Sequence, residues 1–529
     1  MKISKSCNLT IFLLFFSGNQ CGQGYFLVDP TLKIGTNETL PLDCIQCQTV
    51  LTKNLGSLST WQDKFQVAKE CGYNMLHFTP VHVIGASNSA YSLSDQHNLD
   101  PKYQGTWGQV HDLVVKMKED WRMLSICDIV LNHTANESQW ILDHPECSYN
   151  CSSSPHLRPA FLLDRMLFQI TLDIAEGKLE PDIPKGVLNA PHHFDTLETL
   201  IFQKYLPPLK LHEFFMIDVD IEKWKIDNGE VPENDDQDLK IILDPERKRL
   251  GSSVNRSASL EELKKLNQDA YDKCQEDLKS AIANVLNGAK YERLDDKGPK
   301  IQICNADNPI ICEYFTCTIE DHDLIDLEAK MYDDEFSKFF MVHNGWVMGM
   351  DPSVDFASPE SKVYFRRELV AWGDSVKLNY GTCPQDNPFL WQYMKEYVEQ
   401  VAKIFHGVRL DNCHSTPILV AEYLLDAARK INPDLYVIAE LFTGSEETDN
   451  KYLNRLGINS LIREGLRAWN RYSILNDYIQ VEQCIRSFIL TIFCCHFLVM
   501  NLDDWCTITA VMLSDPLLNV MFNLCKLVE

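Results

Sequence analysis

The chain has 529 residues, of which 45% are hydrophobic and 23% charged, a composition typical of a globular protein with a large core. This length indicates more than one domain-sized unit. The formal net charge is −26, which excludes the electrostatic attraction that binds nucleic acid or an anionic membrane surface.

The cysteines and histidines give no pattern typical of a metal site. There are 19 cysteines, and Cys44 and Cys47 form a C-x-x-C pair that no second pair follows. We interpret them as buried thiols of a reducing compartment rather than as zinc ligands, a redox motif or a disulfide scaffold. His192 and His193 are adjacent, which alone is weak support for a metal, and we expect none.

The first 24 residues form an atypical segment with the pattern of a signal peptide. Lys2 and Lys5 precede Leu9–Phe16, an apolar run too short to span a bilayer. This pattern favours secretion, against the cysteine usage, and an alternative start explains residues 1–24 about as well. The later run Cys484–Met500 is a weak membrane candidate that holds an arginine and a histidine, so we expect no membrane association.

Strands and helices are predicted to alternate in residues 25–139. The predicted elements are a helix over Thr60–Cys71, a strand over Met75–Thr79, a helix over Val110–Trp121 and a strand over Leu124–Leu131, followed by Asn132 and His133. Thr60 suits the N-cap of the first helix, and Gly72 suits its C′ position. This alternation favours a parallel barrel, of which residues 25–139 form the first part.

Residues 140–340 are too many for a loop between barrel elements. They contain a helix pattern of their own, Ser259–Leu286, which opens with a capping box of Ser259 and Glu262. We predict a large, mostly helical subdomain inserted over the mouth of the barrel. Residues 341–475 would form the second part of the barrel.

A carboxylate follows a predicted strand in this second part. Ile404–Leu410 is an apolar run typical of a buried parallel strand, and Asp411 comes directly after it, at the end where α/β barrels catalyse reactions. Arg409 points to the same side, so we expect its guanidinium to hold Asp411 ionised and to aim it. His414 follows as a donor near the same mouth. An isolated Arg-x-Asp would by itself indicate only a structural ion pair.

A second carboxylate ends the next structural unit. Pro417–Ile431 has helical spacing, and Leu435–Ala439 is a short apolar strand followed by Glu440. Asp411 and Glu440 are therefore predicted to end neighbouring parallel strands. Two such carboxylates, one ionised and one protonated, are what a retaining glycoside enzyme requires.

Two segments around these carboxylates resemble a known family. Gly407-Val-Arg-Leu-Asp-Asn-Cys-His-Ser-Thr-Pro417 and Val437-Ile-Ala-Glu-Leu-Phe-Thr-Gly-Ser-Glu446 are similar to the 4-α-glucanotransferase half of eukaryotic glycogen debranching enzymes, within the α-amylase superfamily. The resemblance runs from about Tyr25 to about Trp469, with divergent stretches between about 176 and 340. It implies an α/β fold of the (β/α)8 TIM-barrel type and transfer of α-1,4-linked glucan segments.

The resemblance also implies partners and residue roles. The partners would be glycogen and α-1,4-glucan oligosaccharides, and no cofactor would be needed. The location would be cytoplasmic, with secretion as the alternative. The oligomeric state stays open. Asp411 would be the nucleophile and Glu440 the acid and base. Asp128-Ile-Val-Leu-Asn-His133 resembles the first α-amylase signature, in which Asp128 would support Arg409 and His133 would bind the sugar. Substrate contacts are expected from Arg409, His414, His133, Asn132, Asp128, Tyr91 and Trp346.

Aromatic residues are candidates for stacking on sugar rings. Tyr91 lies in a polar loop that supplies such an aromatic in the superfamily, and packing within the loop is an equally good interpretation. His343–Gly349 and Arg366–Asp374 also resemble the debranching enzymes. They contain Trp346, which we assign to the sugar, and Trp372, which we assign to core packing.

After about Trp469 the resemblance fades, and residues 476–529 form a divergent apolar tail. The superfamily binds the reacting sugar with a third carboxylate preceded by a histidine, whereas the candidates here, Asp503 and Asp504, follow Leu502. We expect a barrel incomplete at its C-terminal strands, no α-1,6-glucosidase domain and poor catalysis. A catalytically impaired glycogen-binding fragment and a secreted α-amylase-like hydrolase are the alternatives.

Overall fold

The computed structural model describes residues 2–462, apart from residues 7–8, 17–18, 28–29, 36–37, 234–237, 320–321, 352–353 and 444. Side chains are described from residue 30 onward. The predicted tail from residue 476, with the candidates Asp503 and Asp504, lies outside the described residues.

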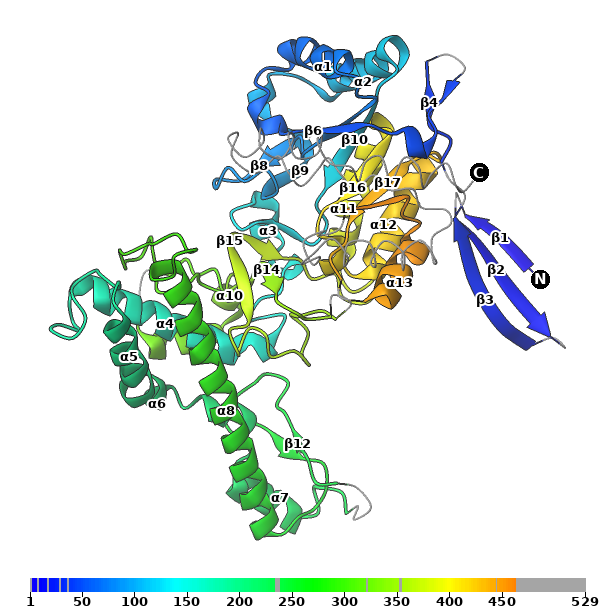
Figure 1. Ribbon diagram of the computed structural model, residues 1–529. Coiled ribbons are helices and arrows are strands. Elements are labelled where there is room, and N and C mark those ends of the chain that lie inside the picture. The colour runs from blue at the N-terminus through cyan, green and yellow to red at the C-terminus, as the bar shows by residue number, and fades with distance from the viewer. Residues whose placement is uncertain are drawn as a thin grey trace, which may run out of the picture.

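Six parallel strands form the central sheet and are adjacent in chain order. They are β6 (Cys47–Val50), β7 (Met75–Phe78), β10 (Leu124–Ile129), β16 (Gly407–Leu410), β17 (Tyr436–Glu440) and β18 (Ser460–Ile462) (Figure 1). Sequential parallel strands joined through helices are the arrangement of a (β/α)8 barrel. The predicted fold class is thus confirmed, with six strands in the described part.

Helices cover the outside of this sheet. They are α1 (Trp61–Glu70), α2 (Trp107–Trp121), α11 (Pro388–Ile404), α12 (Ile418–Ile431) and α13 (Glu446–Leu456). Their apolar faces pack on the strands around fully buried side chains such as Trp61, Phe78 and Val408. Burying these faces in a common core is what holds helices and strands together.

Two local predictions in the barrel are wrong. The predicted strand Ile404–Leu410 begins too early, since Ile404 ends α11 and β16 starts at Gly407. A short apolar run has no period that separates a helix end from a buried strand. Thr60 precedes α1 as predicted, but its hydroxyl donates to Ser57 O at 2.8 Å instead of capping the helix, because a 3-10 turn leads into α1.

A three-stranded antiparallel sheet and two antiparallel strand pairs accompany the barrel. The N-terminal strands β1 (Lys2–Ser6), β2 (Leu9–Phe16) and β3 (Asn19–Leu27) form one sheet, so the apolar run of the signal-like segment is strand β2. Two further pairs are β4 (Lys33–Ile34) with β5 (Glu38–Thr39), and β8 (His82–Ile84) with β9 (Leu93–Leu99). Among the helices of the described residues, none combines the length and apolar character that a bilayer crossing requires.

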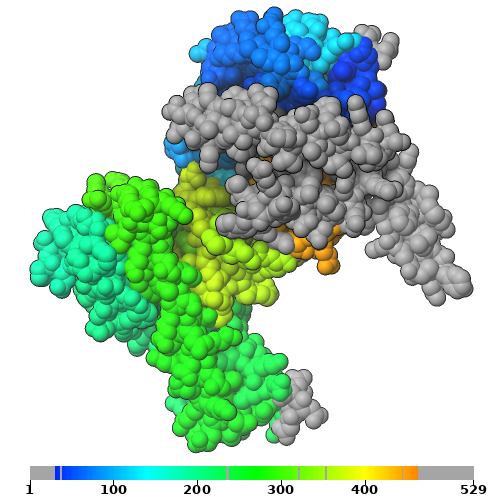
Figure 2. Space-filling view, in the orientation of Figure 1, coloured from blue at the N-terminus to red at the C-terminus, as the bar shows by residue number. Residues whose placement is uncertain are grey.

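Most of the region between β10 and α11 forms a lobe that projects from the barrel, in teal and green in Figures 1 and 2. The short helix α3 (Gln139–Asp143) instead packs on the barrel core through Ile141. The elements of the lobe are α4 (Arg158–Glu176), α5 (Pro191–Leu200), a π-helical turn (Ile201–Tyr205), α6 (Leu206–Leu209), α7 (Val219–Asp227), β12 (Ile241–Ile242), β13 (Ser253–Val254), α8 (Leu260–Arg293), α9 (Leu324–Met331) and α10 (Asp334–Ser337). Much of it shares a second hydrophobic core, which also includes Tyr364 and Leu369 beyond residue 340.

Helix α8 begins as its sequence predicts. Ser259 Oγ accepts a hydrogen bond from the backbone N–H of Glu262, and the Glu262 carboxylate accepts one from the N–H of Ser259. The helix runs seven residues beyond the predicted Leu286, to Arg293. The Arg293 guanidinium there donates to the carbonyls of Ile301 and Ile303, which ties the helix end to the chain that follows.

A three-stranded antiparallel sheet joins the inserted region to the barrel. Its strands, in spatial order, are β11 (His133–Ala135), β15 (Leu369–Lys377) and β14 (His343–Val347). Since β11 follows barrel strand β10 after three residues, this sheet is anchored at the mouth of the barrel.

Candidate active site

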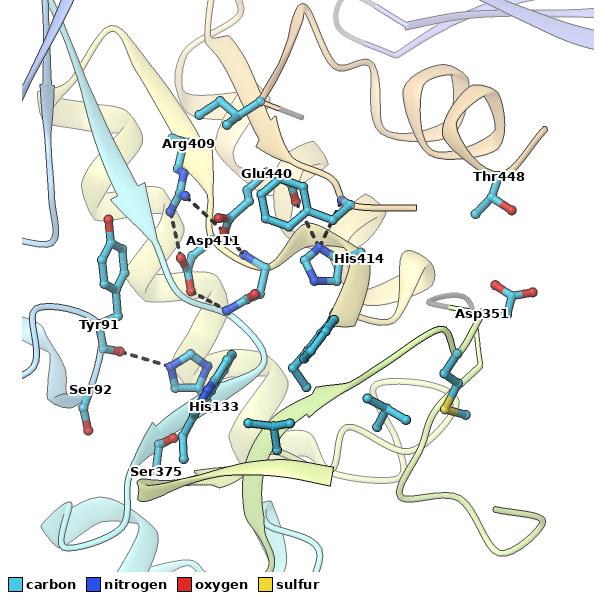
Figure 3. A pocket seen from close by; sticks show the side chains of 18 of the residues that line it. Tyr91, Ser92, His133, Asp351, Ser375, Arg409, Asp411, His414, Glu440 and Thr448 are labelled. Atoms are coloured by element: carbon cyan, nitrogen blue, oxygen red, sulfur yellow. Dashed lines mark hydrogen bonds and ion pairs between the residues drawn. The ribbon is translucent and has the colours of Figure 1, made fainter. Parts of the chain in front are cut away.

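A cavity of about 1480 Å³ opens at the C-terminal ends of the barrel strands (Figure 3). Residues from β14 and β15 line one side of it, and residues at the start of α13 line another. Seven of the nine predicted site residues line this cavity, namely Tyr91, His133, Trp346, Arg409, Asp411, His414 and Glu440. The other two, Asp128 and Asn132, are buried behind it.

Arg409 joins three carboxylates from neighbouring strands. Its Nη1 lies 2.7 Å from Asp128 Oδ1 and 2.7 Å from Asp411 Oδ1, and its Nη2 lies 3.0 Å from Glu440 Oε2. The strand pairing brings the guanidinium and the three carboxylates together, because Arg409 on β16 is in register with Asp128 on β10, and Glu440 ends the adjacent strand β17. Asp411 and Glu440 therefore face one site from the same edge of the sheet.

A close approach of backbone holds β16 beside β17. A Cβ on Gly407 would lie 2.4 Å from the carbonyl oxygen of Tyr436, so only glycine fits at this position. This packing sets the spacing between the two strands that carry Asp411 and Glu440.

The ion pair with Arg409 favours the ionised form of Asp411, and burial and two neighbouring carboxylates oppose it. Burial raises the pKa of Asp411 to about 8, with Arg409 opposing the rise and Glu440 and Asp128 adding to it. One guanidinium shared by three buried carboxylates leaves a surplus of negative charge, which is costly away from water.

Asp128 supports Arg409 from behind, as the resemblance implies. Although burial opposes it, Arg409 and His77 lower the pKa of Asp128, and His77 Nε2 lies 2.8 Å from Asp128 Oδ2. Tyr91 donates its hydroxyl to the same Oδ2 at 3.3 Å, and its ring lies 5.6 Å from the Arg409 guanidinium carbon. Tyr91 thus packs on the charge cluster and also lines the cavity.

His133 lines the cavity with both ring nitrogens engaged. Nε2 lies 3.1 Å from the carbonyl of Tyr91, and Nδ1 lies 2.8 Å from the Asn132 side chain. Both neighbouring atoms, the Tyr91 carbonyl oxygen and Asn132 Oδ1, are acceptors, and burial lowers the pKa of His133 to about 4. Asn132 therefore orients His133 and does not line the cavity.

His414 lines the cavity beside Glu440. Its Nδ1 lies 3.4 Å from the backbone nitrogen of Phe442 and 3.4 Å from the carbonyl oxygen of Glu440, and burial lowers the pKa of His414. These contacts hold the ring in the cavity wall.

The assignment of Trp372 to core packing is wrong. Trp372 is half-buried and lines the cavity together with Trp346, which is 42% exposed. Alternate residues of β15 face opposite sides, so Val370 and Trp372 face the cavity while Leu369 packs in the second core. Trp346 lies opposite Val370 across the strand pair, which places both tryptophans on one face.

Asn412 is a site residue that sequence reasoning missed. Its backbone N–H donates to Glu440 Oε2 at 2.9 Å, and its side-chain Nδ2 donates to Asp411 Oδ2 at 3.1 Å. The signal was an asparagine directly after a strand-ending aspartate, a residue type that favours tight turns. No group of three or more metal-ligating side chains occurs within the described residues.

Comparison with known proteins identifies the family. Residues 38–257 and 237–436 match the family described as glycogen debranching enzyme, glucanotransferase domain. The glycogen debranching enzyme of Saccharomyces cerevisiae is 36% identical over 494 residues, which cover 84% of this chain and 31% of that protein. This chain thus spans about a third of that relative's length.

Solved structures give more distant likenesses. An α-amylase from Lactobacillus plantarum is 12% identical with a TM-score of 0.37, covering 84% of this chain and 60% of that chain. A debranching enzyme from Nostoc punctiforme is 12% identical with a TM-score of 0.33, covering 82% of this chain and 53% of that chain. By the family match and the yeast relative, this chain belongs to the glucanotransferase-domain family of glycogen debranching enzymes.

Proposed function

We propose that this chain is a 4-α-glucanotransferase that moves α-1,4-linked glucan segments through a retaining covalent mechanism. The observation that carries the proposal is the bridge that one guanidinium makes between Asp411 and Glu440 at the mouth of the barrel. Two carboxylates that face one cavity can supply both a nucleophile and an acid.

In the first half of the reaction, ionised Asp411 attacks the anomeric carbon of the donor glucan. The bond from that carbon to the glycosidic oxygen breaks, and protonated Glu440 delivers its proton to the leaving oxygen. The product is a β-glycosyl ester on Asp411 and a shortened glucan. Arg409 stabilises the carboxylates but keeps its own proton, because Asp128, Glu440 and Asp411 outweigh burial and hold its pKa well above the usual value.

In the second half, Glu440 takes the proton of an acceptor 4-hydroxyl as its oxygen attacks the glycosyl carbon. The ester bond breaks, Asp411 is released ionised, and Glu440 is protonated again. The α-linkage is restored and no cofactor is consumed. Transfer exceeds hydrolysis when an acceptor occupies the cavity and water is excluded, a role we assign to the inserted region.

The cavity walls support a glucan as the substrate. Trp346 and Trp372 offer flat apolar surfaces on one side, which match the apolar faces of sugar rings. Across the cavity, Glu447, Thr448 and Lys451 of α13 offer polar groups for hydroxyls. We therefore propose that glycogen branches and α-1,4-glucan oligosaccharides lie between these walls.

The test is a single incubation of purified protein with maltopentaose. Transfer gives both longer and shorter oligosaccharides with α-linkages retained, which chromatography and proton NMR detect. Shorter products and free sugar alone would support the hydrolase alternative and contradict the transferase. Binding to glycogen without any product would support the impaired glycogen-binding alternative instead.

We also propose a reducing compartment for the protein. Twelve cysteines within the described residues are free thiols, and several, such as Cys127 and Cys413, are buried beside the site. Fusion of residues 1–24 to a reporter tests the secretion alternative: a reporter that stays inside the cell supports the proposal, and an exported one contradicts it.

A further inference from the structure

Asn412 donates to both proposed catalytic carboxylates. Glu440 Oε2 accepts from its backbone N–H at 2.9 Å, and Asp411 Oδ2 accepts from its side-chain amide at 3.1 Å. Each carboxylate thus receives one donor from Arg409 and one from Asn412. Neither the sequence motifs nor the family match assigns Asn412 a role.

Both donations depend on an unusual backbone. Asn412 has φ 44° and ψ 47°, in the left-handed region that asparagine adopts more readily than most other residues. It lies directly after Asp411 and before the 3-10 turn Cys413–Ser415. This conformation turns the backbone N–H toward Glu440 on the neighbouring strand while the side chain reaches back to Asp411.

We infer that Asn412 is a positioning residue whose side-chain amide biases Asp411 toward its ionised form. This inference rests on the proposed function, in which Asp411 must be ionised and Glu440 protonated. A donor to a carboxylate favours its ionised form, and the Asn412 amide gives this support to Asp411. The backbone N–H of Asn412 holds Glu440 Oε2 in place on the neighbouring strand.

The bias acts against the burial of Asp411, which favours its protonated form. The groups that face the pair are Arg409 on β16, Asp128 on β10 with its partner His77, the Tyr91 hydroxyl and the His414 ring. Because Asn412 carries no charge, its replacement can move the proton while the net charge of this cluster stays the same.

The decisive variant is Asn412→Gly. Glycine adopts the left-handed backbone freely and keeps the N–H to Glu440, so this change removes only the amide donor to Asp411. Activity at pH 7 should fall about tenfold, and the pH at which activity reaches half its maximum should rise by about one pH unit, since the proton stays more firmly on Asp411. Asn412→Asp should shift that midpoint further in the same direction.

Asn88→Gly is the matched control. Asn88 is also left-handed, with φ 59°, but it is exposed and lies outside the cavity lining, so its replacement should leave the pH profile unchanged. A fall in activity for Asn412→Gly with the parental pH profile would show a merely structural role and overturn the inference.

A second readout separates this inference from the proposed function. Infrared titration of the carboxyl groups, without substrate, compares the parent with Asn412→Gly, using Asp411→Asn to assign the band of Asp411. Failure of the parent to transfer glucan would reject the proposed function, while this titration would still test Asn412. The inference expects a higher titration midpoint for Asp411 in Asn412→Gly, and an unchanged midpoint would refute it.

Discussion

Nη1 of Arg409 lies 2.7 Å from Oδ1 of Asp411, and both side chains are buried. Alone, such a pair would keep Asp411 ionised. Here the guanidinium also contacts Asp128 and Glu440, so one positive charge is divided among three carboxylates. The ionisation of Asp411 therefore depends on the whole cluster.

The first prediction concerns the pH dependence of transfer. Burial and the neighbouring carboxylates raise the pKa of Asp411 to about 8, with Arg409 opposing the rise. Asp411 attacks only as a carboxylate, so kcat/KM should rise as the pH increases toward about 8. Initial rates with maltopentaose from pH 5 to pH 10 measure this rise, and a kcat/KM already at its maximum at pH 5 would contradict the assignment.

The second prediction concerns the nucleophile. Asp411→Asn keeps the volume and can still accept from Arg409, but its amide cannot form the glycosyl ester. Transfer should fall by at least roughly 10³-fold, while glycogen binding stays near the parental affinity, since the aromatic wall is untouched. Product analysis and co-sedimentation with glycogen measure the two properties. Near-parental transfer by Asp411→Asn would mean that another residue attacks.

The third prediction concerns the aromatic wall. Trp346→Ala and Trp372→Ala should each weaken binding of maltoheptaose about tenfold, because a sugar ring loses its flat apolar partner. Trp224→Ala is the control, since Trp224 is 59% exposed on α7 and lies outside the cavity lining. Isothermal titration measures all three variants. Equal affinities for the parent and the two cavity variants would place the glucan elsewhere.

The fourth prediction concerns stability in acid. His82 is fully buried, its two ring nitrogens have no hydrogen-bond partner within the described residues, and burial lowers its pKa from 6.5 to about 3. Below pH 6.5 His82 binds a proton in the unfolded chain but not in the folded chain. The free energy of unfolding therefore decreases as the pH falls. Between pH 7 and pH 5 the parent should lose about 2 kcal/mol more unfolding free energy than His82→Phe.

Urea unfolding at the two pH values measures this difference. The comparison with His82→Phe removes the contribution of the carboxylates that both proteins share. Identical losses for the two proteins would show that His82 is accommodated as a cation in the folded state.

The sequence by itself determined the order of the barrel and the position of its chemistry. The strand before Asp411 and the strand before Glu440 were recognisable because buried parallel strands are continuous apolar runs. Because both carboxylates directly follow or end parallel strands, local sequence was enough to place them at one edge. The start of α8 was equally local, since Ser259 and Glu262 lie within one turn.

Tertiary structure alone decided how these groups share charge and partners. The charge of Arg409 is divided because strands far apart in sequence bring Asp128 and Glu440 beside it, and burial then shifts the pKa of Asp411. Trp372 faces the cavity rather than a core because β15 pairs with both β14 and β11 at the barrel mouth. Spacing along the chain fixes which side chains share a face, but the water and charge around them depend on contacts between distant segments.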